Sequence, residues 1–149
     1  MLKFKHGGHL EFKNLMTRAM IQTLRDLPDR NVMILPVPLA TRRLFHRGYN
    51  QAGLLARGIA KHLDAKIDYD SVRRAHRKDM GHMNAKERAK NISGVFTITK
   101  PKRIRGRRIL LVDDVFTTGA TFNELTKVLK RAGAIWVGGI TFCRTMKAI

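Results

Sequence analysis

Residues 109–122 read Ile-Leu-Leu-Val-Asp-Asp-Val-Phe-Thr-Thr-Gly-Ala-Thr-Phe, and this stretch decides the fold. Its four opening aliphatic residues predict a buried strand, Ile109–Asp113, of the kind found in parallel sheets covered on both faces. A helix with an apolar face is expected over Thr121–Ala132, with Gly133 at its end. The polar residues between the two elements would lie at the carboxyl end of the strand, where open α/β sheets bind their ligands.

The turn between this strand and this helix has the composition of a phosphate-binding loop. Small residues and a glycine let backbone N–H groups approach an anion closely, and threonine hydroxyls add further donors. The amino end of the helix contributes unpaired N–H groups and a partial positive charge. The predicted phosphate ligands are Thr117, Thr118, Gly119, Ala120 and Thr121.

Two adjacent carboxylates, Asp113 and Asp114, precede the turn. Like charges repel each other and repel a phosphate, so the pair needs a specific partner. A vicinal ribose diol supplies one, because carboxylates accept strong hydrogen bonds from hydroxyl groups. The alternative is an acidic turn that only caps the helix, and the ordered combination of strand, acids, small residues and helix disfavours it.

The rest of the chain alternates helical and strand patterns. In chain order we expect a helix over 14–27, a strand over 32–37, a helix over 50–63 capped by Asn50, a strand over 66–72, a short helix near 85–89, a β-favouring run over 94–99, a basic turn over 100–108 and a strand over 135–142. This order predicts an α/β fold, a mostly parallel twisted sheet with helices on both faces, in a single domain over 1–149.

Composition narrows the function classes. The chain has 149 residues and 44% hydrophobic content, with no apolar run long enough to span a membrane, so we expect a cytoplasmic protein. A single cysteine, Cys143, excludes an intrachain disulfide and a multi-cysteine zinc site. The six histidines show no spacing typical of metal ligands. We therefore expect no metal site built by the protein alone.

The net charge of +19 is unevenly distributed. Residues 73–108 contain thirteen Lys/Arg and two acids. Such a field attracts polyanions, either a polyphosphate ligand or a nucleic-acid backbone. A solvated basic surface with no partner is the alternative, and charge alone does not choose between them.

The stretch Ile109–Phe122 resembles the phosphoribosyl diphosphate signature of type I phosphoribosyltransferases. The wider chain resembles the ComF family of competence-associated proteins, through 3–8 (KFKHGG), 35–52 (LPVPLATRRLFHRGYNQA) and 86–96 (KERAKNISGVF) as well. The resemblance implies a type I phosphoribosyltransferase-like fold. It also implies that Asp113 and Asp114 bind the ribose 2′ and 3′ hydroxyls, that Thr117–Thr121 bind the 5′-phosphate, and that Mg²⁺ arrives bound mainly to the phosphoribosyl diphosphate.

Two further segments gain a role from the resemblance. In such folds the loop after the first core strand contacts pyrophosphate, which here corresponds to Leu39, Ala40, Thr41, Arg42 and Arg43. The basic stretch 73–83 would be the loop that closes over the ligand, with Arg77 and Lys78 as candidate catalytic cations. Solvated arginines in the first loop and simple disorder in the second are the alternatives. The family's residues in the second loop differ from 79–83 here, and the zinc-binding segment of longer relatives has no counterpart.

The expected function is a phosphoribosyltransferase that transfers the phosphoribosyl group to a nitrogen nucleophile and releases pyrophosphate. No residue is an obvious general base. A second hypothesis is a non-catalytic phosphoribosyl diphosphate-binding protein, or a factor associated with single-stranded DNA through 73–108, that serves competence and DNA uptake. The acceptor and the oligomeric state, including a homo-oligomer, stay open.

Overall fold

The computed structural model describes residues 11–27, 29–39, 45, 48–75 and 92–145. Its elements, in chain order, are α2 (Glu11–Thr23), the 3-10 turn η1 (Leu24–Asp26), β1 (Met33–Pro36), α4 (Gln51–Leu63), β2 (Val72–Arg74), β3 (Phe96–Ile98), α6 (Pro101–Ile104), β4 (Arg108–Phe116), α7 (Ala120–Arg131) and β5 (Trp136–Arg144). Within these ranges no helix is long and apolar enough to cross a membrane.

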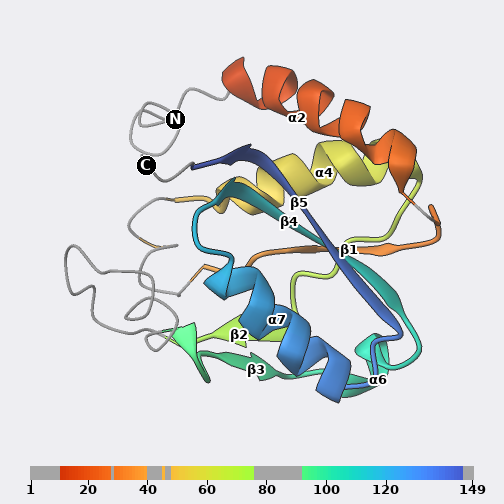
Figure 1. Cartoon of the computed structure of the whole chain (residues 1–149), viewed down its shortest axis with the longest axis vertical. Coiled ribbons are helices and arrows are strands. Elements are labelled where there is room, and N and C mark those ends of the chain that lie inside the picture. The colour runs from red at the N-terminus through yellow and green to blue at the C-terminus, as the bar shows by residue number, and fades with distance from the viewer. Residues whose placement is uncertain (1–10, 28, 40–44, 46–47, 76–91, 146–149) are drawn as a thin grey trace.

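The central sheet has the order β1-β4-β5, and both pairings are parallel. Residue Ile67 forms an isolated parallel bridge with Ile34 on the other side of β1, so the chain runs briefly alongside that strand as well. Strands β2 and β3 form a separate antiparallel pair. Figure 1 shows the long strands β4 and β5 crossing the molecule side by side, with β2 and β3 apart from them below α7.

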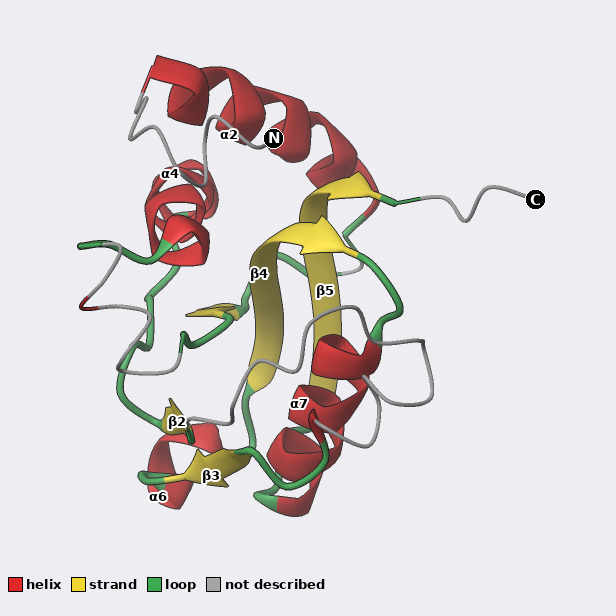
Figure 2. Cartoon of the chain, turned by 90° about the vertical axis from the view of Figure 1, so that its left-hand side faces the viewer, coloured by secondary structure: helices red, strands yellow, loops and turns green. Residues whose placement is uncertain are grey.

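Helices cover both faces of the sheet because consecutive strand residues point to opposite sides. One buried cluster joins Leu110 and Val112 of β4 to α2 and α4, and another joins Ile109 and Leu111 to α7. Figure 2 shows α2 and α4 on one side of the two long strands and α7 on the other. Helices α2 and α4 meet at Gly58, where a Cβ would lie 2.4 Å from Thr17 Cγ2.

The predicted α/β class is confirmed, and three element boundaries are corrected. Strand β4 continues to Phe116 instead of ending at Asp113, because β5 keeps pairing with it as far as Arg144. The expected basic turn over 100–108 contains the short helix α6, started by Pro101 at its first position. The expected strand over 66–72 is replaced by the bridge at Ile67 and by the first residue of β2, Val72, because the Asp68 side chain accepts from the N–H groups of Asp70 and Ser71 and turns the chain between them. The helix expected near 85–89 falls outside the described residues.

Candidate functional site

Strand β4 places Asp113 and Asp114 at the carboxyl edge of the sheet. Asp113 pairs in register with Thr141 of β5, and its carboxylate accepts a hydrogen bond from the backbone N–H of Asp114 at 2.9 Å. Asp113 is half-buried and Asp114 is buried. Strand alternation directs Asp113 to the face of α7 and Asp114 to the face of α4. The two carboxylates therefore flank the end of the central strand from both sides.

Gly119 forms the turn that leads from β4 into α7. Its φ of 75° lies in the left-handed region, and a Cβ there would come within 2.7 Å of Phe116 Cζ. The Phe116 and Phe122 rings lie 5.9 Å apart at a tilt of 41°, on either side of this glycine in the sequence. Two aromatic rings thus pack under the turn, and only glycine satisfies both its backbone conformation and its close approach to Phe116.

The amino end of α7 is open to an anion. Gly119 is its N-cap and has no side chain to accept from the first-turn N–H groups. Among the residues that the structure describes, this turn has a long side-chain hydrogen bond, 3.4 Å, from the Ala120 N–H to Thr118 Oγ1. Most helices begin with a side chain that satisfies these donors. The first turn of α7 therefore presents N–H donors and the positive end of the helix dipole, the features with which a helix start attracts an anion.

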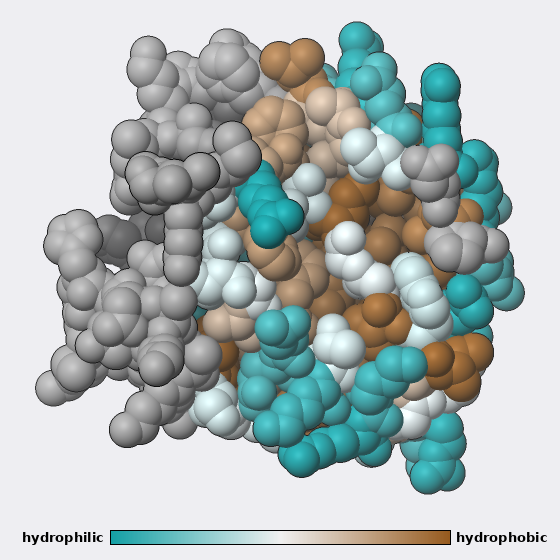
Figure 3. All heavy atoms as spheres, viewed as in Figure 1, coloured by the Kyte–Doolittle hydropathy of each residue, from teal (hydrophilic) through white to brown (hydrophobic). Residues whose placement is uncertain are grey.

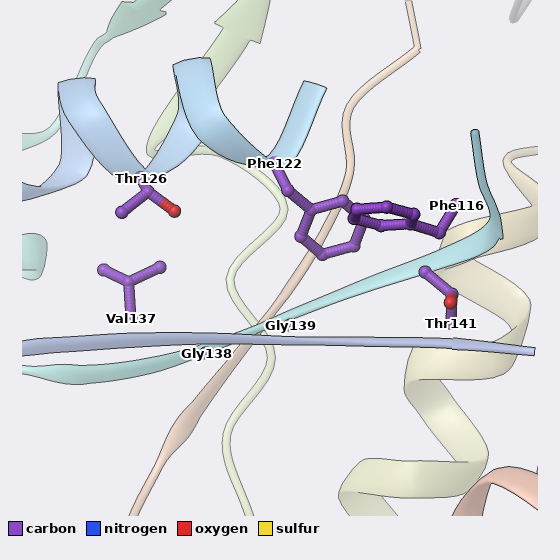
Figure 4. A pocket seen from close by; sticks show the side chains of 7 residues that line it. All are labelled: Phe116, Phe122, Thr126, Val137, Gly138, Gly139 and Thr141. Atoms are coloured by element: carbon purple, nitrogen blue, oxygen red, sulfur yellow. The ribbon is translucent and has the colours of Figure 1, made fainter. Parts of the chain in front are cut away.

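A slot of about 240 Å³ lies beside this turn, between α7 and β5 (Figure 4). Its walls carry no charged side chain; they are formed by Phe116, Phe122, Thr126, Val137, Gly138, Gly139 and Thr141. Gly139 is required there, because a Cβ would lie 2.4 Å from the Phe122 ring. The slot is unsuited to a phosphate. Gly139 leaves room for the Phe122 ring, which packs at the start of α7.

The loop after β1 begins at the same edge of the sheet. The Val37 N–H donates to Val112 O at 2.9 Å, and the Asn50 side-chain amide donates to Val37 O at 3.1 Å. Asn50 also caps α4, as predicted, by accepting from the Ala52 N–H at 3.1 Å. The next residue, Gln51, is 3% exposed, and its amide nitrogen has no hydrogen-bond partner. A second helix therefore begins next to the acidic pair.

A cation also lies at this edge. The Arg144 guanidinium, at the end of β5, lies 5.4 Å from the centre of the Phe116 ring. The Arg144 guanidinium and Gly119 therefore approach the same ring. The sequence offered one signal for this cation, an arginine two residues after the expected end of the final strand at 142.

The predicted binding residues that the structure describes come together. Asp113, Asp114 and 117–121 lie on consecutive elements at one edge of the sheet, and half-buried Leu39 follows β1 at that edge. The other pyrophosphate candidates, Ala40, Thr41, Arg42 and Arg43, lie outside the described residues, as do Arg77 and Lys78. The supporting roles of Phe116, Phe122 and Gly139 were not predicted; the signal was two aromatic residues three positions to either side of Gly119.

Known proteins resemble this chain in sequence. A family model described as "Phosphoribosyl transferase domain" matches residues 9–148. The chain is 37% identical over 121 residues to DNA utilization protein YhgH of Escherichia coli strain K12, covering 80% of this chain and 51% of that protein. It is 33% identical to Competence protein F of Haemophilus influenzae, covering 88% and 60% respectively. It is 30% identical to Competence protein ComFC of Bacillus subtilis, covering 96% and 58%. The chain thus spans about half to three-fifths of the length of these relatives.

Solved structures share the fold at low sequence identity. A purine phosphoribosyltransferase from Pyrococcus horikoshii superposes with a TM-score of 0.53 at 16% identity, over 91% of this chain and 83% of that one. A structure of the allosteric regulatory enzyme of purine biosynthesis superposes with a TM-score of 0.58 at 13% identity, over 87% of this chain and 26% of that one. These likenesses establish the type I phosphoribosyltransferase fold.

Proposed function

Since the chain belongs to the phosphoribosyltransferase domain family, we propose that it binds phosphoribosyl diphosphate together with Mg²⁺ at the carboxyl edge of its sheet. We further propose that it transfers the phosphoribosyl group to a nitrogen nucleophile and releases pyrophosphate. The observation that carries the proposal is the uncapped amino end of α7, reached through Gly119 directly after two carboxylates. This arrangement offers donors for a phosphate and acceptors for a sugar diol on consecutive residues.

Each part of the ligand has a partner in the proposal. The backbone N–H groups of 117–121 and the threonine hydroxyls hold the 5′-phosphate. Asp113 and Asp114 accept hydrogen bonds from the ribose 2′ and 3′ hydroxyls. The helix dipole and the guanidinium of Arg144 offset the repulsion between these carboxylates and the phosphate. Pyrophosphate is assigned to the loop that starts at Leu39, with Arg42 and Arg43 as its cations, because guanidinium groups bind phosphate oxygens in a bidentate manner.

In the proposal Mg²⁺ arrives bound mainly to phosphoribosyl diphosphate. No group of three or more His, Cys, Asp or Glu side chains gathers in the part of the chain that the structure describes. Mg²⁺ prefers oxygen ligands and is commonly held by one or two carboxylates with substrate phosphates. Asp113 and Asp114 are the carboxylates at this edge, and the ion would neutralise charge on the departing pyrophosphate.

The reaction is a substitution at the ribose anomeric carbon. The nitrogen nucleophile forms the new bond to this carbon as the bond to the pyrophosphate oxygen breaks, pyrophosphate leaves with the electron pair, and the proton lost by the nitrogen passes to solvent. The protein contributes by holding the 5′-phosphate and the diol so that the anomeric carbon faces the acceptor. Cations around the leaving group stabilise the charge that develops there.

Two measurements test the proposal in sequence. Calorimetric titration with phosphoribosyl diphosphate and Mg²⁺ should give saturable binding, which Asp113→Asn/Asp114→Asn should weaken at least 10-fold, because each charged hydrogen bond is worth about 1.5–3 kcal/mol. A pyrophosphate-release assay over nucleobase, ammonia and amine acceptors should then give turnover with one of them. Full-affinity binding by the Asn variant would refute the ribose assignment.

The second candidate is a non-catalytic phosphoribosyl diphosphate-binding protein. The departure of 79–83 from the family's loop residues favours it, because this loop is the expected source of catalytic cations. The release assay separates the two candidates: binding without pyrophosphate release for any acceptor would replace the enzyme with this binder. The names of the relatives connect it to competence and DNA utilization.

A further inference from the structure

A basic hollow lies at the opposite edge of the sheet from the candidate phosphoribosyl site. It has a volume of about 830 Å³ and is bounded by the segment before β1, the turn after α4, the turn between α6 and β4, and the start of β5. In Figure 1 the amino ends of β4 and β5 meet α6 in this region, far from the carboxyl end of β4. The hollow therefore belongs to neither the acidic pair nor the phosphate turn.

Cations outnumber carboxylates around this hollow. Its lining includes Arg30, Lys66, Arg103, Arg107 and Arg108 against Asp64 and Asp68. Arg108 is engaged by Asp29 at 3.2 Å, and Arg103 lies 3.8 Å from Asp70. The carboxylate of Asp68 is also engaged, since it accepts from the N–H groups of Asp70 and Ser71, both at 2.9 Å, and from the Ser71 hydroxyl.

Three of the lining cations remain available to a ligand. Arg30, Lys66 and Arg107 are exposed, and none of them forms an ion pair with another described residue. They come from the segment before β1, the turn after α4 and the turn before β4, so they stand around the rim on separate segments. Lys102 and Arg105 extend the exposed positive surface along α6 and the turn after it. Cations spread in this way suit a chain of phosphates better than a single one.

The floor of the hollow is aliphatic. Val32 and Leu63 are buried there, Met33 and Ile67 are half-buried, and Ile135 at the start of β5 is 60% exposed. In Figure 3 hydrophilic residues surround apolar ones over much of the visible face, and they crowd its lower end. A rim of cations around an aliphatic floor offers separate surfaces to the phosphates and to an unpaired base. A duplex would present only its phosphates, because its bases are stacked inside.

We infer that this hollow binds the sugar-phosphate backbone of single-stranded nucleic acid, with Arg30, Lys66 and Arg107 on phosphates and Ile135 against a base. This site is independent of the proposed transferase function, because the two lie at opposite edges of the sheet. Its set of cations also differs from the basic stretch 73–108, which the sequence offered as a nucleic-acid-binding segment. Arg73 lies on the separate β2–β3 pair, whereas Arg103, Arg107 and Arg108 join Arg30 and Lys66, which lie outside that stretch.

The test is fluorescence anisotropy of a labelled oligothymidylate titrated with the full chain. The triple variant Arg30→Gln/Lys66→Gln/Arg107→Gln should lose affinity on the order of 100-fold at about 0.1 M salt, since each lost phosphate contact lowers the salt slope of log K by about 0.7. The slope should therefore fall by about 2. The matched control Arg18→Gln/Arg73→Gln/Lys127→Gln removes the same charge from exposed positions outside the hollow and should bind within about 3-fold of the unchanged chain.

Several outcomes would overturn the inference. Equal losses of oligonucleotide affinity in the two triple variants would show that the overall positive charge of the protein attracts the oligonucleotide, and not the hollow. Duplex DNA that binds as tightly as the single strand, or a mononucleotide that displaces the oligonucleotide at equal phosphate concentration, would exclude single-strand recognition. Unchanged affinity for an abasic oligonucleotide would remove the base contact. The Asp113→Asn/Asp114→Asn variant should bind the oligonucleotide normally, so failure of the transferase proposal and failure of this one give different results.

Discussion

Replacement of Gly119 by alanine tests whether the turn before α7 needs both its backbone conformation and its closeness to Phe116. The left-handed conformation at φ 75° costs a non-glycine residue about 1–2 kcal/mol. The new Cβ, placed 2.7 Å from Phe116 Cζ, adds a crowding cost of about 1–3 kcal/mol. The two costs together lower the free energy of unfolding by about 2–5 kcal/mol, and displacement of the first-turn N–H groups weakens binding of phosphoribosyl diphosphate.

A matched control separates these two costs. Gly94 has nearly the same backbone conformation, φ 70°, but a Cβ there would meet nothing within 4 Å. Gly94→Ala should therefore cost only the conformational part, about 1–2 kcal/mol, and leave ligand affinity unchanged. Adding Phe116→Leu to Gly119→Ala should recover part of the crowding cost, which appears as a coupling energy in a double-mutant cycle.

Urea unfolding and calorimetric titration measure both effects. The reasoning is refuted if Gly119→Ala and Gly94→Ala are equally stable and bind phosphoribosyl diphosphate equally well. It is also refuted if the double-mutant cycle shows no coupling between Gly119 and Phe116. Either result would mean that the turn tolerates a side chain and that the rings beneath it do not set its position.

Two more perturbations follow from the structure. Gly139→Ala would place a Cβ 2.4 Å from the Phe122 ring, and Gly138→Ala would place one 2.2 Å from the Trp136 ring. Urea unfolding should show that both variants are destabilised, whereas calorimetric titration should show weaker ligand binding for Gly139→Ala alone. Equal ligand affinities of the two variants would contradict the role of Phe122. The Asp68 pKa is lowered from 3.8: burial acts to raise it, but hydrogen bonds from the Ser71 hydroxyl and two backbone N–H groups, with the charge of Arg103, together prevail. The ionised carboxylate therefore stabilises the fold at pH values above the ordinary pKa, and this stabilisation is lost as the pH falls through the lowered pKa. The difference in free energy of unfolding between the wild-type chain and Asp68→Asn should therefore shrink in acid. A difference that does not change with pH would contradict this reasoning.

The parts of the fold that the sequence predicted are those with a strong local pattern. The aliphatic run before Asp113 can pair only in the interior of a sheet, and Asn50 has the side chain that a helix start requires, so both appear where expected. Strand β4 extends further than predicted because β5 supplies pairing partners through Phe116, and that information lies outside the stretch itself.

The sequence predicted the residues of the candidate site as a motif, but it did not predict the packing that supports them. The order of acids, small residues and Gly119 identifies a ligand edge, because these residue types have few other reasons to occur together. The packing of Phe122 against Gly139 joins α7 to β5, and a single sequence carries no signal for that pair. The hollow was missed for the same reason: the fold brings Arg30, Lys66 and Arg107 together from distant segments.

The central claim is that Ile109–Phe122 binds a ribose 5-phosphate group through its diol as well as its phosphate. Calorimetric titration with ribose 5-phosphate and with 2-deoxyribose 5-phosphate tests it directly, because the two ligands differ only in the 2-hydroxyl, one of the two hydroxyls assigned to the acidic pair. We expect ribose 5-phosphate to bind at least about 10-fold more tightly, from the loss of one charged hydrogen bond, and we expect Asp113→Asn/Asp114→Asn to abolish that preference. Equal affinity of the unchanged chain for the two sugars would contradict the account.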